Sequence, residues 1–308
     1  MSSTQKAIVF GPTGAVGRTA ALEARRRGAH VYLAMRDTSK AISGLNFLDT
    51  GYTRVQADLS DPASLTRAVE ESSATTAFVY CLFTGHNHMV NSFAALKDAG
   101  IKYVVLLSSF KVAQNARETD MDDFVAAGHA KIEIALEESG LAYAAVRPAY
   151  FNSNVLWNLN EIKSGEVGLL YSDVKFDYLA PEDIGAVCGA ILVEPSFQKP
   201  DRDRGRSKAF YLCGPELLSQ QHAHKILAQR LNREIKIKEI SEKAWMEKYS
   251  YMPSPALEAL LKGLRSSHEG YDMYERMYEK AVSNVKKYKE AEPMKFEEWV
   301  EANKAAFA

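Results

Sequence analysis

The sequence predicts an α/β protein built on a doubly wound parallel sheet, followed by a smaller, mostly helical C-terminal part. Three observations lead to this fold class: strand-like runs rich in β-branched residues, helical spacers between them, and a glycine-rich turn after the first run. Strands that alternate with helices pair in parallel through right-handed crossovers, which place helices on both faces of the sheet. The six runs cover residues 6–10, 30–35, 53–58, 76–83, 103–109 and 142–151.

Helical patterns fill the intervals between these runs. Residues 17–27 lack helix breakers, and residues 89–99 and 122–139 continue the alternation. Asp61 and Pro62 are typical of an N-cap and a first helical position, and an apolar stripe follows them. Each helix therefore carries the chain back to the end of the sheet at which the next parallel strand begins.

The alternation changes after residue 151, which predicts a boundary between a sheet domain (1–151) and a C-terminal substrate-binding part (152–308). Some C-terminal segments are expected to return to the sheet. Asn152-Ser153-Asn154 is polar and hinge-like, and residues 199–208 read as an exposed charged loop. The last forty residues are helical, with a stripe that we interpret as packing: Tyr271, Tyr274, Tyr278, Val282, Val285 and Tyr288.

The composition is that of a globular protein. Of 308 residues, 46% are apolar and 25% charged, and 38 basic residues balance 39 acidic ones. This balance predicts neither a nucleic-acid nor a membrane partner. Without a secretory signal or an apolar run of about 20 residues, we expect a cytoplasmic protein. Cys81, Cys188 and Cys213 are expected to be reduced core thiols.

The turn after the first strand has the order that a dinucleotide site needs: strand, glycine turn, helix. Gly11 permits the tight turn, Gly14 lets a pyrophosphate approach the backbone, and Gly17 lets the helix lie close to the strand. The helix N-terminus offers free N–H groups to the phosphates. The predicted cofactor contacts here are Gly11, Thr13, Gly14, Ala15, Val16 and Gly17.

The second and third strands end in residues that discriminate between cofactors. Arg36 stands where an acidic residue would hold the ribose of NAD, so NADP(H) is favoured, through ion pairing with the 2′-phosphate. The alternative is a surface Arg36 paired with Asp37. Asp58 and Leu59 are placed to border the adenine, unless Asp58 serves only as a helix cap.

These motifs resemble the NmrA-like branch of the atypical short-chain dehydrogenases, which includes isoflavone-reductase-like and quinone-reductase-like enzymes. The spacing Gly-x-x-Gly-x-x-Gly is typical of that group. The resemblance covers nearly the whole chain and implies either an NADPH-dependent reductase or a protein that senses the dinucleotide without turnover. It is carried by residues 9–17, 56–59, 104–109, 141–151, 181–185 and 295–300.

The Tyr-x-x-x-Lys pair of typical short-chain dehydrogenases is missing from the 122–139 helix. The resemblance puts His129 where that acid or lysine would stand, with Glu133 one turn later. Their spacing places both on one helix face, so Glu133 is expected to orient His129 and favour its charged form. The alternative is a histidine–glutamate pair on the helix surface.

Further candidates lie at the carboxyl ends of other strands. Ser109 is a candidate for catalysis, and Lys111 for a site role, although Ser109 can also be a mere strand cap. A small-molecule substrate is expected between the sheet and the C-terminal part, and a homodimer or protein partner is left open. The remaining predicted cofactor contacts are Cys81, Leu82, Phe83, Ser108, Tyr150 and Asn152.

No metal site is expected. His86 and His88 flank one residue but lack a supporting carboxylate or cysteine, and His222 and His224 are judged likewise. The leading hypothesis is an NADPH-dependent reductase acting on a small carbonyl, quinone or conjugated double bond. The alternative is a non-catalytic NADP(H) sensor that acts through a protein partner.

Overall fold

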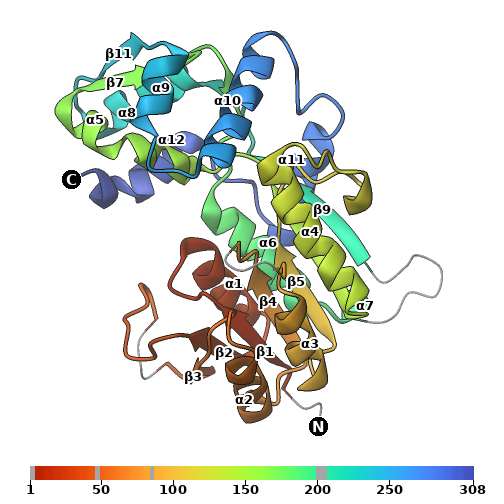
Figure 1. Cartoon of the computed structure of the whole chain (residues 1–308). Coiled ribbons are helices and arrows are strands. Elements are labelled where there is room, and N and C mark those ends of the chain that lie inside the picture. The colour runs from red at the N-terminus through yellow and green to blue at the C-terminus, as the bar shows by residue number, and fades with distance from the viewer. Residues whose placement is uncertain (1–3, 46–48, 84–86, 199–206) are drawn as a thin grey trace.

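The computed structural model describes residues 4–45, 49–83, 87–198 and 207–308. Within them, seven parallel strands form one sheet in the order β3-β2-β1-β4-β5-β6-β9, which confirms the doubly wound fold (Figure 1). The order reverses between β1 and β4, where such sheets bind ligands. The strands are β1 (Lys6–Phe10), β2 (His30–Met35), β3 (Tyr52–Gln56), β4 (Thr76–Tyr80), β5 (Tyr103–Leu107), β6 (Ala142–Pro148) and β9 (Ser207–Leu212).

Helices cover both faces of this sheet. Successive strand residues point to opposite sides, so Ala7 and Val9 pack in one core and Ile8 and Phe10 in the other. The predicted cap of α2 is confirmed, because the Asp61 carboxylate accepts a hydrogen bond from the Ala63 N–H. One face carries α2 (Pro62–Ser72), α3 (Val90–Asp98) and α4 (Phe124–Glu138); the other carries α1 (Ala15–Arg26), α6 (Pro181–Val193) and α11 (Tyr278–Lys289).

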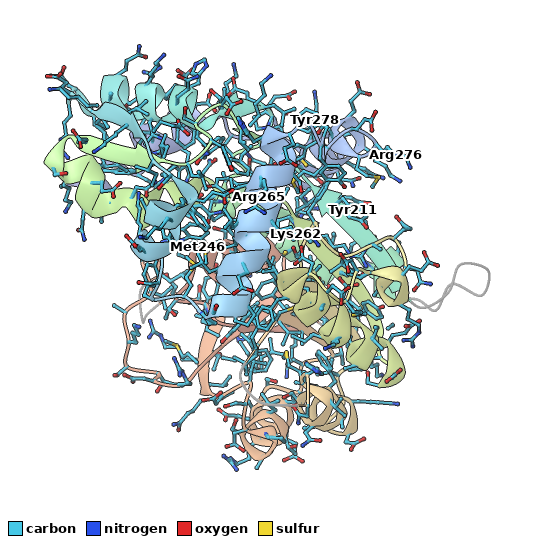
Figure 2. All side chains as sticks on the ribbon, turned by 45° about the horizontal axis from the view of Figure 1, so that its top comes forward. Tyr211, Met246, Lys262, Arg265, Arg276 and Tyr278 are labelled. Carbon is cyan, nitrogen blue, oxygen red and sulfur yellow. The ribbon has the colours of Figure 1, made fainter. Side chains whose placement is uncertain are left out.

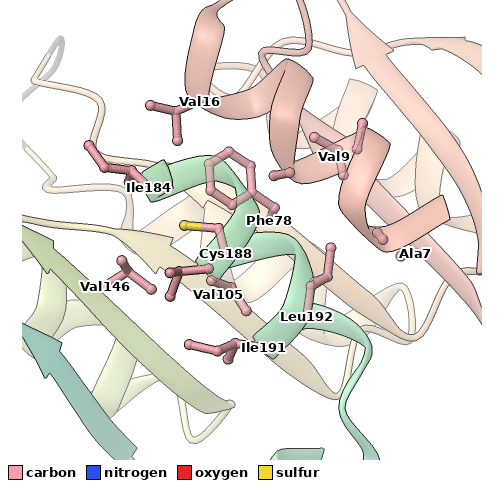
Figure 3. Packing of buried hydrophobic residues seen from close by; sticks show 14 of the residues in the cluster. Ala7, Val9, Val16, Phe78, Val105, Val146, Ile184, Cys188, Ile191 and Leu192 are labelled. Atoms are coloured by element: carbon pink, nitrogen blue, oxygen red, sulfur yellow. The ribbon is translucent and has the colours of Figure 1, made fainter. Parts of the chain in front are cut away.

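Helix α6 is buried almost throughout, packed on the sheet between α1 and α11 (Figure 3). Two glycines allow this approach. A Cβ on Gly185 would lie 2.5 Å from the Val16 carbonyl oxygen, and one on Gly189 would lie 2.5 Å from that of Ala20. The backbones of the two helices are therefore in direct contact, and this contact fixes the start of α1 beside the sheet.

The C-terminal part adds β9 to the sheet and then forms a smaller lobe with its own apolar cores (Figure 1). In this lobe β7 (Glu166–Leu169) runs parallel to β11 (Lys236–Glu239), and β8 (Lys175–Phe176) runs antiparallel to β10 (Leu218–Ser219). The other elements of this lobe are α5 (Leu159–Ser164), α8 (Gln220–Leu231), α9 (Glu242–Lys248), α10 (Ser254–His268), α12 (Phe296–Ala302), and the 3-10 turns η2 (Asn152–Asn158) and η3 (Lys304–Phe307). Outside it, α7 (Pro195–Gln198) contacts β6, and the 3-10 turn η1 (Ala116–Glu118) contacts α4.

Two predictions about this part need correction. The 152–154 segment is no exposed hinge, because it begins the turn η2 and Asn152 is fully buried. Of the predicted charged loop, residues 199–206 lie outside the described residues, and Ser207 already starts β9.

Other expectations hold. All three cysteines are buried free thiols. None of the helices in the described ranges is long and apolar enough to cross a bilayer.

Candidate functional site

The glycine turn between β1 and α1 shows which glycines the chain itself requires. Gly11 has a φ of +69°, and a Cβ on Gly17 would lie 2.4 Å from the Gly11 carbonyl oxygen. Gly14 differs, because its φ of −82° and ψ of 155° suit any residue and an added Cβ would lie 3.6 Å from its nearest neighbour. Nothing within the described chain demands a glycine at position 14. The space beside it, at the N-terminus of α1, is open to a ligand.

A cavity of about 250 Å³, which we call the first cavity, opens at the carboxyl ends of β1 to β4. It borders the reversal in strand order, and it brings together residues from the glycine turn and from the ends of the second and third strands. Its lining comprises Phe10, Gly11, Thr13, Ala34, Met35, Arg36, Ala57, Asp58, Leu59, Ser60, Tyr80 and Leu82.

Arg36 is the cation of the first cavity. The alternative pairing with Asp37 is not observed, because the Asp37 carboxylate accepts hydrogen bonds from the Ser39 N–H (2.9 Å) and hydroxyl (2.6 Å). The guanidinium makes no ion pair with any residue in the described ranges. Hydrogen bonds from the backbone and hydroxyl of Ser60 lower the pKa of Asp58. The charge of Arg36 also lowers the pKa of Asp58, so the cavity holds a guanidinium without a direct ion pair and an ionised carboxylate nearby.

Sequence reasoning missed several lining residues and extended the third to sixth strands past their observed ends. Tyr80 ends β4 and its ring lies against Gly11, whereas the prediction continued that strand to residue 83. The Cys81 side chain is buried in the core, and Cys81 does not line the first cavity. Phe83 is 60% exposed and lines neither cavity described here. Position was the signal that could have found them, because Tyr80 ends β4 at the reversal point and Ser60 comes shortly after the end of β3.

A second cavity of about 240 Å³ lies between the carboxyl ends of β5 and β6 and the C-terminal lobe. Helix α10, which carries Lys262 and Arg265, lies between that lobe and α4 (Figure 2). The lining is mainly aromatic and apolar, with a few polar groups. It comprises Ser109, Phe110, Lys111, Val125, Pro148, Ala149, Tyr150, Asn154, Trp157, Asn158, Phe176, Gln220, Trp245, Tyr249, Leu260, Gly263, Leu264, Ser267, Met273 and Tyr274.

Tyr150 is held in the wall of the second cavity by its neighbours. Its ring stacks on Phe176 with centroids 4.0 Å apart, and its N–H donates to the Asp177 carboxylate at 2.8 Å. Burial raises the pKa of its phenol, so the hydroxyl keeps its proton at neutral pH. That hydroxyl makes no hydrogen bond to another side chain or carbonyl of the described chain. It is therefore available to a ligand.

Asp177 joins four segments beneath this cavity. Besides Tyr150, it accepts hydrogen bonds from the Gly214 N–H at 2.8 Å and the Tyr274 hydroxyl at 2.9 Å. Burial raises the pKa of this carboxyl to about 6, although these hydrogen bonds oppose the shift. Not all residues of the predicted packing stripe serve packing. Tyr274 lines the second cavity, and Tyr271 is 67% exposed.

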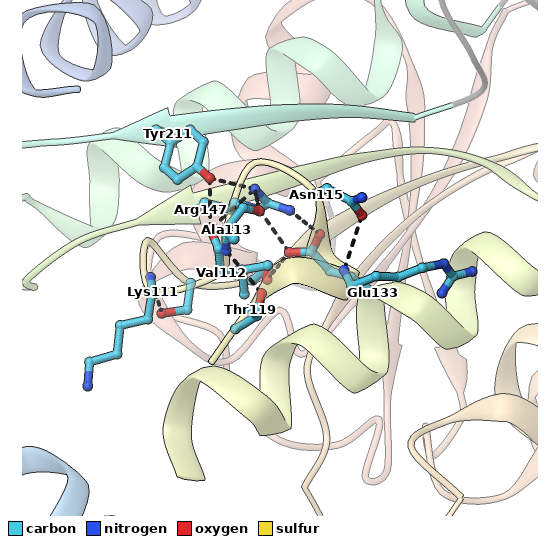
Figure 4. A network of polar contacts seen from close by, with 11 residues as sticks. Lys111, Val112, Ala113, Asn115, Thr119, Glu133, Arg147 and Tyr211 are labelled. Carbon is cyan, nitrogen blue, oxygen red and sulfur yellow. Dashed lines mark hydrogen bonds and ion pairs between the residues drawn. The ribbon is translucent and has the colours of Figure 1, made fainter. Parts of the chain in front are cut away.

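The predicted partnership of Glu133 with His129 is wrong. Arg147 binds both Glu133 oxygens, at 3.0 and 2.6 Å, and the Ser108 hydroxyl donates to one of them (Figure 4). Arg147 also donates to the Ala113 carbonyl and the Tyr211 hydroxyl. A buried carboxylate needs a paired cation, and the fork of Arg147 supplies it from the neighbouring strand. The network links the end of β5 with α4, β6 and β9, and none of these four side chains lines either cavity.

His129 lies on α4 but lines neither cavity. Its ring packs edge-on against Phe83, with centroids 4.9 Å apart, and its Nδ1 is buried without a partner among the residues described. Burial lowers the pKa of His129 to about 4. The expectation of a charged imidazole is therefore wrong, and His129 is neutral at pH 7.

We predict that the ring resonances of His129 do not titrate between about pH 5.5 and 8. Because the folded pKa lies below its ordinary value of 6.5, neutral His129 contributes stability above pH 6.5 that is lost as pH falls toward 4. Between these limits the loss should amount to about 1 to 3 kcal/mol. NMR titration and urea unfolding of the wild type and His129→Gln test this. A His129 midpoint near 6.5 would contradict it.

The remaining candidates are also placed. Asn152 is fully buried, and both of its amide atoms lack a partner within the described residues. His86 lies outside the described residues, and the part that is described holds no cluster of three metal-ligating side chains. The His224 Nδ1 bonds the Gln220 carbonyl at 2.8 Å, as in a helix core.

Comparison with known proteins places the chain in a family. The NmrA-like family profile matches residues 3–300. The chain is 34% identical to the nitrogen metabolite regulation-like protein bik4 of Gibberella fujikuroi, with 96% of this chain and 95% of that protein covered.

Two solved structures share its fold. The NADPH complex of a quinone oxidoreductase from Escherichia coli matches with a TM-score of 0.70 and 17% identity, over 97% of this chain and 99% of that one. The negative transcriptional regulator Nmra matches with a TM-score of 0.69 and 16% identity, over 97% and 96%. The fold, the glycine turn and the match over nearly the whole length agree: the chain belongs to the NmrA-like family.

Proposed function

We propose that this protein is an NADPH-dependent reductase, with NADP(H) in the first cavity and a small carbonyl, quinone or conjugated double-bond substrate in the second. The observation that carries the proposal is the second cavity itself. An apolar, aromatic-lined space with a few polar groups beside the cofactor site is what a substrate requires. A protein that only senses the dinucleotide needs no such space.

The first cavity fits NADP(H). The open space at Gly14 and the free N–H groups of the first turn of α1 suit a pyrophosphate. Arg36 forms no ion pair within hydrogen-bond distance among the described residues and suits a 2′-phosphate, while Asp58 and Leu59 border the adenine side. The Escherichia coli structure of the same fold was solved with NADPH, which supports this assignment.

The chain's own groups then hold the substrate and supply a proton. Bound NADPH supplies a hydride. Tyr150 presents a neutral hydroxyl to the oxygen on which negative charge develops, and its stack on Phe176 fixes the ring. Ser109, in the same wall, is the second candidate donor. His129, which lines neither cavity, has no role in this scheme.

The competing function is a non-catalytic NADP(H) sensor that acts through a protein partner. The observation that favours it is the regulatory naming of bik4 and Nmra. The decisive experiment follows NADPH absorbance at 340 nm across a panel of carbonyls, quinones and enones. Turnover with any class supports the reductase. Tight NADPH binding without turnover across the panel would favour the sensor.

The cofactor preference gives a prediction for Arg36. Arg36→Ala should weaken NADPH by about 1.5 to 3 kcal/mol, the range for a hydrogen bond to a charged group, and NADH hardly at all. Fluorescence titration with both cofactors isolates the 2′-phosphate, and Lys40→Ala serves as the nearby cationic control. Equal losses for NADPH and NADH would remove Arg36 from phosphate recognition.

A further inference from the structure

The charged side chain in the lining of the second cavity is a cation. Of its lining residues, Lys111 is the charged one, and no aspartate or glutamate lines it in the part of the chain described. A buried apolar space that offers a single ammonium discriminates by charge, because an anion gains a partner there and a second cation gains repulsion.

The ammonium of Lys111 is fixed but not saturated. Its Nζ donates to the Asp123 carboxylate at 2.7 Å, and the side chains of both residues are largely buried. An ammonium has three donors, so two remain for a ligand. The partner carboxylate is shared, because its other oxygen accepts hydrogen bonds from the Val125 and Ala126 N–H groups at the start of α4. The N-terminus of α4 thus stabilises part of the negative charge of Asp123, and Asp123 neutralises Lys111 less completely.

Gly263 keeps the space around this ammonium open. It lies inside α10, where a glycine costs about 1 kcal/mol relative to alanine. Its backbone is helical, and the nearest atom to an added Cβ is the Lys111 Nζ, at 3.9 Å. The chain therefore has no steric need for glycine there. Because Gly263 has no side chain, a ligand can approach the Lys111 ammonium from this side.

Aromatic rings dominate the rest of the wall. Tyr150 and Phe176 form a stacked pair, and Trp245 packs edge-on against Tyr249 at 5.0 Å between centroids. Flat rings of this kind accept another flat ring by stacking or edge contact.

We infer that the second cavity selects planar aromatic ligands that carry an acidic group, with the acid on Lys111 and the ring among the aromatic side chains. This inference depends on the proposed function only in so far as the bound acid is also the substrate of the reductase. Binding of the acid to Lys111 is a property of the cavity and is measured without turnover.

The test compares 2-naphthoate with 2-naphthamide, which share a ring system and differ in charge. We expect calorimetry on the wild type to show naphthoate binding about tenfold tighter or more, the effect of a charged hydrogen bond. Lys111→Met should remove this preference and leave naphthamide within about twofold, whereas Lys111→Arg should keep it. Lys262→Met, next to Gly263 on α10 but outside the lining, is the control and should change the affinity for neither ligand.

A second variant works in the opposite direction. Asp123→Asn keeps an oxygen to cap α4 but frees the ammonium, so it should tighten naphthoate by about three- to tenfold. Equal binding of the two probes to the wild type, or a naphthoate preference that survives Lys111→Met, overturns the inference. Acid-selective binding alongside a failed NADPH-oxidation panel would sink the reductase proposal and leave this site standing.

Discussion

Gly14→Val should abolish measurable NADPH binding while the protein stays folded. The backbone of Gly14 is in the extended region that valine favours, and its Cβ position is 3.6 Å from the nearest atom. The side chain would instead occupy the place of the pyrophosphate at the N-terminus of α1. Losing two charged hydrogen bonds of about 1.5 kcal/mol or more each weakens binding about 100-fold at least. Fluorescence titration with NADPH measures it.

Gly17→Val is the informative comparison. Its side chain would meet the Gly11 carbonyl at 2.4 Å, so the backbone must move and the folded state should lose stability. Thermal unfolding should therefore separate the two variants: near wild type for Gly14→Val and clearly lower for Gly17→Val. A folded Gly14→Val variant with normal NADPH affinity would mean that the dinucleotide does not bind on this turn.

What could be predicted from sequence depended on how far apart the interacting residues lie. The strands β1 and β2, the Asp61 cap and the glycine turn follow from local rules, and all appear at or within a few residues of their predicted places. The end of β4 was set too late because Cys81 and its neighbours stay apolar after leaving the ladder. The Cys81 side chain remains buried although it lies past the end of β4. An apolar run in the sequence indicates burial and does not show where strand pairing ends.

The error at Glu133 has the same origin. Helical spacing correctly puts Glu133 one turn from His129, but spacing cannot reveal a stronger partner from another element. That partner, Arg147, stands on β6, and Ser108 follows β5. Arg147 lies in the 141–151 segment that carries the family resemblance, but its partner could be identified only from the fold.

Sequence reasoning named Ser109, Lys111 and Tyr150 as site residues but could not assemble the rest of the second cavity. Its wall combines Tyr150, Phe176, Trp245 and Tyr274, which are separated by tens of residues and belong to different elements. The stripe containing Tyr274 has helical spacing, but α11 begins only at Tyr278, so Tyr274 is released from that helix to reach Asp177. Only the tertiary structure brings these side chains together.

Tyr150→Phe should lower turnover by about two to four orders of magnitude, the usual contribution of a positioned proton donor, and leave NADPH affinity within about tenfold. Phenylalanine keeps the stack on Phe176 and the N–H bond to Asp177, so only the hydroxyl is lost. The donor acts on charge that develops at the substrate oxygen, so kcat and kcat/KM should fall together.

His129→Ala is the matched comparison, because His129 was the donor expected from sequence. His129 lines neither cavity and is neutral at pH 7, so its removal should change turnover far less than Tyr150→Phe. Ser109→Ala tests the second hydroxyl of the same wall. Since burial raises the pKa of Tyr150, wild-type turnover should also show no loss from deprotonation of this donor up to about pH 9. Normal turnover in Tyr150→Phe with a large loss in His129→Ala would return the proton donor to α4 and require a substrate position on the Phe83 side of the sheet.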